Sequence, residues 1–266
     1  MSKFIEREVN LDAKKSWYLK CSPKDMAEAV ILVGDPARVQ MFAGQMSAAQ
    51  VVAQDREFTS LTGEYKGVRV SVVSVGIGAP SVAIVLEELW ELGARVVVRA
   101  GTALALNVPA GYFILANGAV RYEGVSSTYL PLEYPAVCDP DLLYSFQDTL
   151  RKENASYATG ILATSDGFYT HLFEHTIPGR VPQRRSVTLL KGLNQNGVLG
   201  ADMETSAVYI VGHYLGLKTL SLLVTTVDGR TSQMIDPSQR SAREEQLVHL
   251  VLQGMYDYVS RQGEKL

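Results

Sequence analysis

Short apolar runs alternate with amphipathic helical segments along almost the whole chain, and this alternation constrains the fold more than any other feature. Strands separated by helices are typical of α/β domains, in which helices pack on a central sheet. The predicted strands are Val30–Val33, Val68–Val75, Val96–Val98, Phe113–Ala116, Gly160–Ala163 and Leu220–Val227. No linker rich in Pro, Gly or Ser, no repeat and no low-complexity segment interrupts the pattern. We therefore expect one α/β domain over residues 1–266, with residues 1–16 as an N-terminal extension.

Three of the predicted helices have clear boundaries. Proline is favoured in the first turn of a helix, and glycine is favoured just beyond its last turn. The first helix begins near Pro80 and ends before Gly93, the second covers Glu204–Leu215 before Gly216, and the third covers about Ala242–Arg261. The third helix contains Gly254, and a glycine in a helix interior costs about 1 kcal/mol relative to alanine. The sequence offers no reason for this glycine.

Composition excludes several classes of protein. The 266 residues include 25 basic and 28 acidic side chains, so the net charge of −3 leaves no broad basic surface for nucleic acid or a membrane. Two cysteines, Cys21 and Cys138, are too few for a disulfide framework or a metal-ligand cluster, which fits a reducing compartment. The segment Met1–Lys15 is charged and lacks the apolar core of a signal peptide, and no apolar run is long enough to span a membrane. We expect a cytoplasmic protein.

Arg99 stands directly after the apolar run Val96–Val98 and before the small residues Ala100, Gly101 and Thr102. A guanidinium beside a buried strand is costly unless an anion compensates its charge. Ligands of open α/β sheets bind at the carboxyl ends of strands. The Thr102 hydroxyl, together with the close backbone approach that Gly101 permits, suits a phosphate. A structural carboxylate paired with Arg99 is the alternative interpretation.

A second site of the same design follows the apolar run Val30–Val33, where the sequence continues Gly34-Asp35-Pro36-Ala37-Arg38. Pro36 suits the first turn of a helix, which would place Arg38 near the partially positive N–H groups of the helix start. Two predicted strand ends therefore each present an arginine beside a glycine. This repetition favours an anion site over an ordinary Gly-Asp-Pro turn.

Carboxylates occur near the ends of two further predicted elements. Asp202, Met203 and Glu204 come at the start of a helix, where a carboxylate often caps the helix or compensates its dipole. Glu204 can alternatively accept hydrogen bonds from adjacent hydroxyls of a sugar, with Met203 as an adaptable apolar wall. Asp228 and Arg230 lie just beyond the last predicted strand. They either belong to an ordinary Asp-Gly turn, or Asp228 donates a proton with Arg230 close by.

Taken together, these motifs resemble those of the nucleoside phosphorylase family, which includes uridine phosphorylase and the hexameric purine nucleoside phosphorylases. The resemblance spans about residues 18–230 and keeps the family's motif order. The matching segments are Gly34-Asp35-Pro36-Ala37-Arg38, Arg56-Glu57-Phe58, Gly76-Ile77-Gly78-Ala79-Pro80-Ser81, Arg99-Ala100-Gly101-Thr102, Pro131-Leu132-Glu133-Tyr134-Pro135-Ala136-Val137, Ser165-Asp166-Gly167-Phe168-Tyr169 and Asp202-Met203-Glu204. We therefore expect a single three-layer α/β/α domain around a mixed, twisted central sheet.

The resemblance implies reversible phosphorolysis, in which a nucleoside and inorganic phosphate give a free base and ribose 1-phosphate, with no cofactor and no metal. The residues that it assigns to phosphate are Gly34, Arg38, Arg99, Thr102 and, from a neighbouring subunit, Arg56. Those that it assigns to the nucleoside are Met203, Glu204 and Tyr18 for the ribose, Phe168 for the base, and Asp228 with Arg230 for catalysis. Phosphate beneath the developing sugar cation acts as stabiliser and nucleophile. Asp228 protonates the departing base, which requires burial to raise the pKa of its carboxyl.

The motifs conflict about which base is bound. Uridine phosphorylases read the uracil edge with a glutamine and an arginine shortly after the stacking phenylalanine, but neither residue occurs between Phe168 and Arg180. Without these readers, polar base atoms stay unpaired in the pocket. The loop at Val227-Asp228-Gly229 resembles one whose aspartate serves N7 of a purine, whereas the segment 131–137 is similar to the uridine phosphorylase branch. We expect purine nucleosides as substrates, with uridine phosphorylase as the alternative.

Shared active sites in the family imply a homo-oligomer, with a dimer as its minimal unit and a hexamer as the expected assembly, acting in nucleotide salvage. Tyr18 stands where the family often has a histidine that reaches the ribose 5′-hydroxyl in the neighbouring subunit, and a phenol can also hydrogen-bond there. A nucleosidase that uses water stays open, although it would leave three arginines without an anion. A non-catalytic nucleoside-binding relative also stays open, although it would not need Glu204 and Asp228.

Two histidines raise the question of a metal site. His171 and His175 are four residues apart and could share one helical face as ligands. No third ligand with suitable spacing follows them except Glu174, so we expect no metal.

Overall fold

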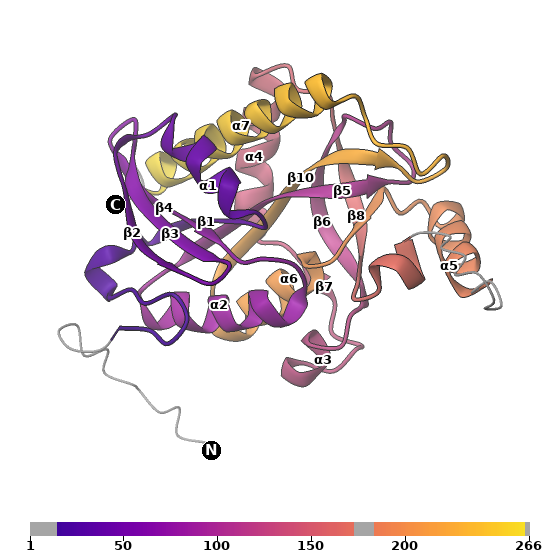
Figure 1. The fold of residues 1–266 in the computed structure, drawn as a ribbon, viewed down its shortest axis with the longest axis horizontal. Helices are drawn as coiled ribbons and strands as arrows, with labels where there is room; N and C mark the ends of the chain where they lie inside the picture. The colour runs from indigo at the N-terminus through magenta and orange to yellow at the C-terminus, as the bar shows by residue number, and fades with distance from the viewer. Residues whose placement is uncertain (1–14, 173–183, 264–266) are drawn as a thin grey trace.

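The computed structural model describes residues 15–172 and 184–263, and one large mixed sheet runs through them (Figure 1). The strands in this part of the chain are β1 (Ala29–Val33), β2 (Ser47–Asp55), β3 (Phe58–Tyr65), β4 (Val68–Ser74), β5 (Val96–Ala105), β6 (Phe113–Tyr122), β7 (Ala136–Val137), β8 (Tyr157–Ser165), β9 (Gly200–Asp202) and β10 (Lys218–Asp228). The central strands β4, β1, β5 and β10 run parallel to one another. Every residue of β1 is buried, as expected for an apolar strand that is covered on both faces.

The sheet is open on one side and closed on the other. β3 pairs antiparallel with β4, and β2 pairs antiparallel with β3, so β2 forms the open edge. On the other side, β5 pairs with both β10 and β9, β10 pairs with β6, and β8 joins β6 to β9. These five strands therefore close on themselves like a small barrel. The short β7 pairs with the second half of β6.

Helices cover both faces of the sheet. They are α1 (Pro36–Ala43), α2 (Ala79–Glu91), α3 (Ser126–Tyr129), α4 (Pro140–Lys152), α5 (Arg184–Gln195), α6 (Thr205–Leu215) and α7 (Pro237–Gly263) in the described residues. Figure 1 shows α1, α4 and α7 on one face and α2 with α6 on the other, and α4 packs on α7 as α2 packs on α6. This is the predicted three-layer α/β/α fold. Across 15–172 and 184–263, none of the helices combines the length and apolar character needed to cross a bilayer.

The predicted strands are all present, but most of them are longer than predicted. The prediction that a strand ends at Val98 is wrong, since β5 continues through Arg99 to Ala105 and its backbone pairs with β10 over this whole length. Arg99 is therefore a mid-strand residue. The hairpin of β2 and β3 is absent from the sequence prediction, because polar residues interrupt the apolar positions of both strands and β2 is mostly exposed.

The packing of α7 on α4 explains Gly254. A Cβ atom at position 254 would lie 2.6 Å from the Phe146 ring of α4, far inside van der Waals contact. Phe146 is fully buried, so the ring has little freedom to move away. The glycine therefore allows the two helices to approach closely, and this approach offsets its poor helix propensity.

Candidate active site

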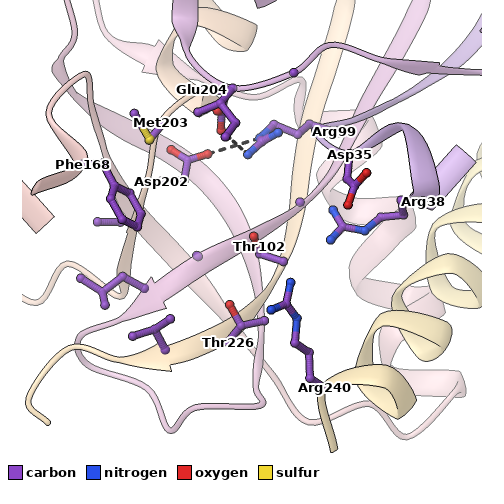
Figure 2. Close-up of a pocket in the computed structure, with 18 of the residues that line it drawn as sticks. Asp35, Arg38, Arg99, Thr102, Phe168, Asp202, Met203, Glu204, Thr226 and Arg240 are labelled. Atoms are coloured by element: carbon purple, nitrogen blue, oxygen red, sulfur yellow. Dashed lines mark hydrogen bonds and ion pairs between the residues drawn. The ribbon is translucent and has the colours of Figure 1, made fainter. Parts of the chain in front are cut away.

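A cavity of about 490 Å³ lies at the carboxyl ends of the parallel strands, where ligands of α/β proteins bind (Figure 2). Gly34 follows β1, Gly76 follows β4, and Thr226 belongs to the last residues of β10. The predicted site residues that line the cavity are Gly34, Arg38, Arg99, Thr102, Phe168, Met203 and Glu204. Figure 2 shows Phe168 and Met203 at one end and Arg38 at the other.

Arg38 enters the cavity from the first turn of α1. The Asp35 carboxylate caps this helix by accepting a hydrogen bond from the Ala37 N–H at 2.8 Å. The Arg38 guanidinium is buried, and its Nη2 donates to Glu244 Oε1 at 3.2 Å. Its Nε is buried without a hydrogen-bond partner among the described residues, and burial lowers the pKa of this guanidinium. A buried donor left unpaired beside a cavity is suited to an anion.

Arg99 enters the cavity from β5, and Gly101 makes room for it. A Cβ atom at position 101 would lie 2.8 Å from Arg99 Nη2, so the guanidinium occupies the space that a side chain would fill. Arg99 Nε donates to Asp202 Oδ2 at 3.3 Å, and Nη2 forms an ion pair with Glu204. Burial alone would lower the pKa of Arg99, but the carboxylates of Glu204 and Asp202 raise it. Arg99 therefore pairs with structural carboxylates, as the alternative interpretation predicts, and it also lines the cavity.

Asp202 holds the start of α6 in place, as the capping interpretation predicts. Its carboxylate accepts hydrogen bonds from Thr205 Oγ1 at 2.6 Å and from Thr164 Oγ1 at 2.8 Å, in addition to the bond from Arg99. The Asp202 side chain is fully buried. These contacts fix Arg99 and the adjacent residues Met203 and Glu204 relative to one another.

Glu204 connects the start of α6 to the glycine turn before α2. Its Oε1 accepts a hydrogen bond from the Gly78 N–H at 2.7 Å, and its Oε2 pairs with Arg99. Gly78 has φ of 100°, a conformation that favours glycine and directs its N–H at the carboxylate. Burial raises the pKa of Glu204, and Arg99 opposes this effect. Each carboxylate oxygen has a second lone pair for a ligand hydroxyl.

Asp228 and Arg230 do not line the cavity. Arg230 donates to the Asp228 carboxylate from its side-chain Nη2 at 3.1 Å and from its backbone N–H at 2.8 Å. These hydrogen bonds lower the pKa of Asp228. The expectation that burial raises this pKa is therefore wrong, because the carboxylate is partly exposed and lies in a turn rich in donors. The geometry of Asp228 fits an ordinary Asp-Gly turn better than it fits a proton donor.

Tyr18 and Arg56 also lie away from the cavity, but they lie together. The Arg56 guanidinium is 5.6 Å from the centre of the Tyr18 ring, and both residues line a second, separate hollow. The buried Glu88 of α2 accepts hydrogen bonds from the N–H groups of Tyr18 and Leu19, both at 2.8 Å. The two residues assigned to a neighbouring subunit's site thus belong to one patch, which also exposes Trp17.

His171 shares a hydrogen bond with Ser165 and does not line the cavity. His175, Glu174 and Arg180 lie outside the described residues. Among the residues that the structure does describe, no group of three or more side chains is arranged to hold a metal ion.

Arg240 also lines the cavity, from the first turn of α7, and was not predicted from the sequence. Its Nε donates to Glu244 Oε1 at 3.0 Å. The sequence signal was an arginine four residues before a glutamate. Such a spacing by itself predicts only an ion pair on a helix surface.

The fold and the cavity together define an α/β protein with a cavity at the carboxyl ends of its parallel strands, lined by arginines, buried carboxylates and a partly exposed aromatic ring. The phosphorylase superfamily model matches residues 28–252. The chain is 34% identical over 221 residues to uridine phosphorylase of Thermococcus kodakarensis, covering 82% of this chain and 79% of that protein. It is 31% identical to guanosine phosphorylase of Halorubrum lacusprofundi, covering 81% and 83% of the two chains.

The solved structures agree with these relatives. The crystal structure of uridine phosphorylase from Vibrio fischeri has a TM-score of 0.83 at 32% identity and covers 92% of this chain and 98% of its own. The chain therefore belongs to the phosphorylase superfamily. This result confirms the resemblance to the nucleoside phosphorylase family and the predicted enzyme class, a nucleoside phosphorylase.

Proposed function

We propose that this nucleoside phosphorylase uses inorganic phosphate to cleave uridine, and that it releases uracil and ribose 1-phosphate. The main support for phosphorolysis is that Arg38, Arg99 and Glu204 line the same cavity. The uridine phosphorylases among the relatives support uridine as the substrate. The low pKa of Asp228 also favours uridine, because a purine would need a proton at N7.

In the proposed complex, phosphate accepts hydrogen bonds from the unpaired Nε of Arg38 and from the guanidinium of Arg99. The Thr102 hydroxyl lies in the same lining and supplies a further donor. Guanidinium groups match the oxygens of phosphate in geometry and charge. Preorganised cations here hold the nucleophile beside C1′ and cost no reorganisation during the reaction.

The ribose binds between Glu204 and Met203, with its hydroxyl groups donating to the Glu204 carboxylate. A phosphate oxygen forms a bond to C1′ while the C1′–N1 bond breaks, and the electron pair of the broken bond leaves with the base. Positive charge develops on the sugar in this transition state. The phosphate and Glu204 stabilise that charge.

The base stacks on Phe168 and leaves as an anion whose charge is spread over the uracil ring. The hydrogen phosphate ion loses its proton when it becomes a sugar phosphate, and uracil takes up one proton at N1, so the reaction is balanced without a protein acid. An ionised Asp228 is compatible with this route.

A purine nucleoside is the second candidate. It is favoured by the guanosine phosphorylase among the relatives and by the resemblance of Val227-Asp228-Gly229 to the purine-type loop. In that case the Asp228–Arg230 pair must open when the nucleoside binds.

The test is a comparison of kcat/KM for uridine, thymidine, inosine, guanosine and adenosine, with and without phosphate. We expect uridine to give the highest value and phosphate to be required. A higher value for inosine or guanosine would overturn the uridine assignment. Turnover without phosphate would identify a nucleosidase, and tight nucleoside binding without turnover would identify a non-catalytic relative.

We further propose that two copies of the chain share their sites, with Tyr18 and Arg56 of one copy reaching the cavity of the other. The support is that these two residues share one exposed patch outside their own cavity. A hexamer built from such dimers, a cytoplasmic location and a salvage role belong to the same proposal. The two cysteines are buried and unpaired, which is compatible with a reducing compartment.

A further inference from the structure

A third guanidinium enters the cavity from α7. Arg240 lies in the first turn of this helix, and Figure 2 shows its side chain extending past Thr226 toward Thr102. Its Nε is held by Glu244 one turn later, at 3.0 Å from Oε1. The two terminal amino groups of Arg240 make no hydrogen bond within the described part of the chain, and they are free to bind a ligand.

Arg240 and Arg38 share a single carboxylate oxygen. Arg38 Nη2 lies 3.2 Å from the same Glu244 Oε1 that accepts from Arg240. One negative charge therefore stands between two positive charges. The excess positive charge lies at the edge of the cavity, where a bound anion would be attracted by both guanidinium groups.

The charges that line the cavity balance only when Arg240 is included. The other charged side chains in the lining are Asp35, Arg38, Arg99, Asp202 and Glu204. Without Arg240 these five sum to one negative charge, and a phosphate dianion would enter against it. Arg99 is already in contact with two carboxylates, so it offers little uncompensated charge. The positive charge available to a dianion therefore comes mainly from Arg38 and Arg240, which share the single compensating charge of Glu244, a residue outside the lining.

We propose that Arg240 is a phosphate-binding residue of this site, which donates hydrogen bonds from its terminal amino groups to inorganic phosphate in one direction and to the phosphate group of ribose 1-phosphate in the other. This inference rests on the proposed phosphorolysis. The planar guanidinium can bind two phosphate oxygens at once, and its Nε anchor on Glu244 orients it in advance. Helix α7 thereby contributes a phosphate ligand from the same subunit.

The test is Arg240→Met, which keeps an unbranched apolar chain and removes the charge. We expect the KM for phosphate to rise by about 10- to 100-fold, the range for a hydrogen bond to a charged group, while the KM for uridine changes less than about twofold. In the reverse direction, the KM for ribose 1-phosphate rises by a similar factor and that for uracil does not. Arg240→Lys restores part of the phosphate affinity because it restores the charge.

Arg243→Met is the matched control. It removes one positive charge from the next turn of the same helix, where Arg243 donates to Gln246 and does not line the cavity. Arg243 is half-buried, with its guanidinium 6.0 Å from the centre of the Phe113 ring. The KM of this variant for phosphate stays within about twofold of the wild-type value, because Arg243 does not line the cavity and donates nothing to a ligand there. Calorimetric titration of inorganic phosphate into both variants measures binding independently of turnover.

The outcomes separate this inference from the proposed function. An unchanged KM for phosphate in Arg240→Met, with phosphate-dependent turnover in the wild type, overturns the role of Arg240 alone. Equal increases in the KM values of both substrates would make Arg240 a structural partner of Glu244 and would also overturn it. A wild-type enzyme that turns over without phosphate overturns the proposed function itself.

Discussion

At the scale of the residue, the proposed anion site depends as much on the absence of a side chain at Gly101 as on the side chains present. Residues 99 and 101 lie on the same face of β5, because side chains two apart in a strand point the same way. The Arg99 guanidinium lies over Gly101, in reach of Asp202 and Glu204. Any side chain at position 101 would displace the guanidinium from these carboxylates.

Arg99→Ala is expected to lower kcat by roughly 10² to 10³, as does the loss of one preorganised donor to a transition state. The KM for phosphate also rises, because the variant loses a cation that faces the cavity. Steady-state kinetics over a range of phosphate concentrations, with a thermal unfolding curve, measures both effects. Wild-type kinetics in this variant would remove Arg99 from the phosphate site.

Asp228→Asn separates the two candidate bases. Uracil takes up its proton without a protein acid in the proposed route, so kcat/KM for uridine is expected to change by less than about threefold, a small fraction of one electrostatic contact. If Asp228 instead protonates a purine, inosine or guanosine turnover falls by about 10² or more, and 7-methylguanosine, whose base leaves without a proton, is spared. Measuring kcat/KM for uridine, inosine and 7-methylguanosine in the wild type and in Asp228→Asn decides between these outcomes. A large loss for uridine would contradict the proposed route.

Several site residues could be predicted from the sequence because each stands at a recognisable boundary. Arg38 follows Gly-Asp-Pro at a helix start, and Glu204 stands at the start of another helix. Arg240 could not be predicted, since it comes from the other end of the chain and resembles an ordinary surface pair with Glu244. The pKa of Asp228 was predicted wrongly because it depends on donors in its own turn, which a sequence does not display.

At the scale of the element, the apolar cores of β1, β4, β5, β6, β8 and β10 could be predicted, but their ends could not, and β2, β3, β7 and β9 were not predicted. The second half of β5 consists mainly of small residues, Ala100 to Ala105, which carry little apolar signal. These residues form a strand because β10 and β9 flank them in the closed part of the sheet. Their backbone hydrogen bonds come from tertiary pairing, and local propensity gives no sign of it.

Gly254→Ala tests the packing of α7 on α4. The added methyl group would overlap the buried Phe146 ring, so we expect a loss of about 1–3 kcal/mol in the free energy of unfolding, even though alanine is the better helix former. Urea denaturation followed by circular dichroism measures the change.

The matched control for this variant is Gly192→Ala in α5. No atom lies within 4 Å of the added Cβ there, so this change is expected to stabilise the protein by up to about 1 kcal/mol. If Gly254→Ala is as stable as Gly192→Ala, the two helices separate easily and close packing does not explain the glycine.

At the scale of the whole molecule, the site residues divide into two groups. Seven predicted residues gather in the cavity, whereas Tyr18 and Arg56 gather in a separate hollow on the same chain. The division is explained if Tyr18 and Arg56 contribute to the cavity of a second copy of the chain. It could be predicted only from the family resemblance, since no pattern within one chain reveals which of its residues act on a neighbour.

Mixing two inactive variants tests the shared site. Arg56→Ala and Arg99→Ala are each expected to have little activity alone, but a mixed dimer contains one cavity with both arginines intact. Random subunit exchange then restores up to roughly a quarter of wild-type activity. Native mass spectrometry confirms the exchange. No recovery after confirmed exchange would place Arg56 in its own subunit's site or in none.

The ion pair between Arg99 and Glu204 has a consequence for how the two substrates influence each other. The two groups are ion-pair partners in the structure, and in the proposed reaction phosphate attracts the cation while the sugar hydroxyls donate to the carboxylate. In the proposed complex, a substrate that weakens this ion pair bears the free-energy cost of doing so, and the substrate that binds second does not bear it again. Linkage makes the effect reciprocal, so each substrate tightens the binding of the other. If the proposed function holds, this ion pair therefore couples the binding of the nucleophile to the binding of the electrophile.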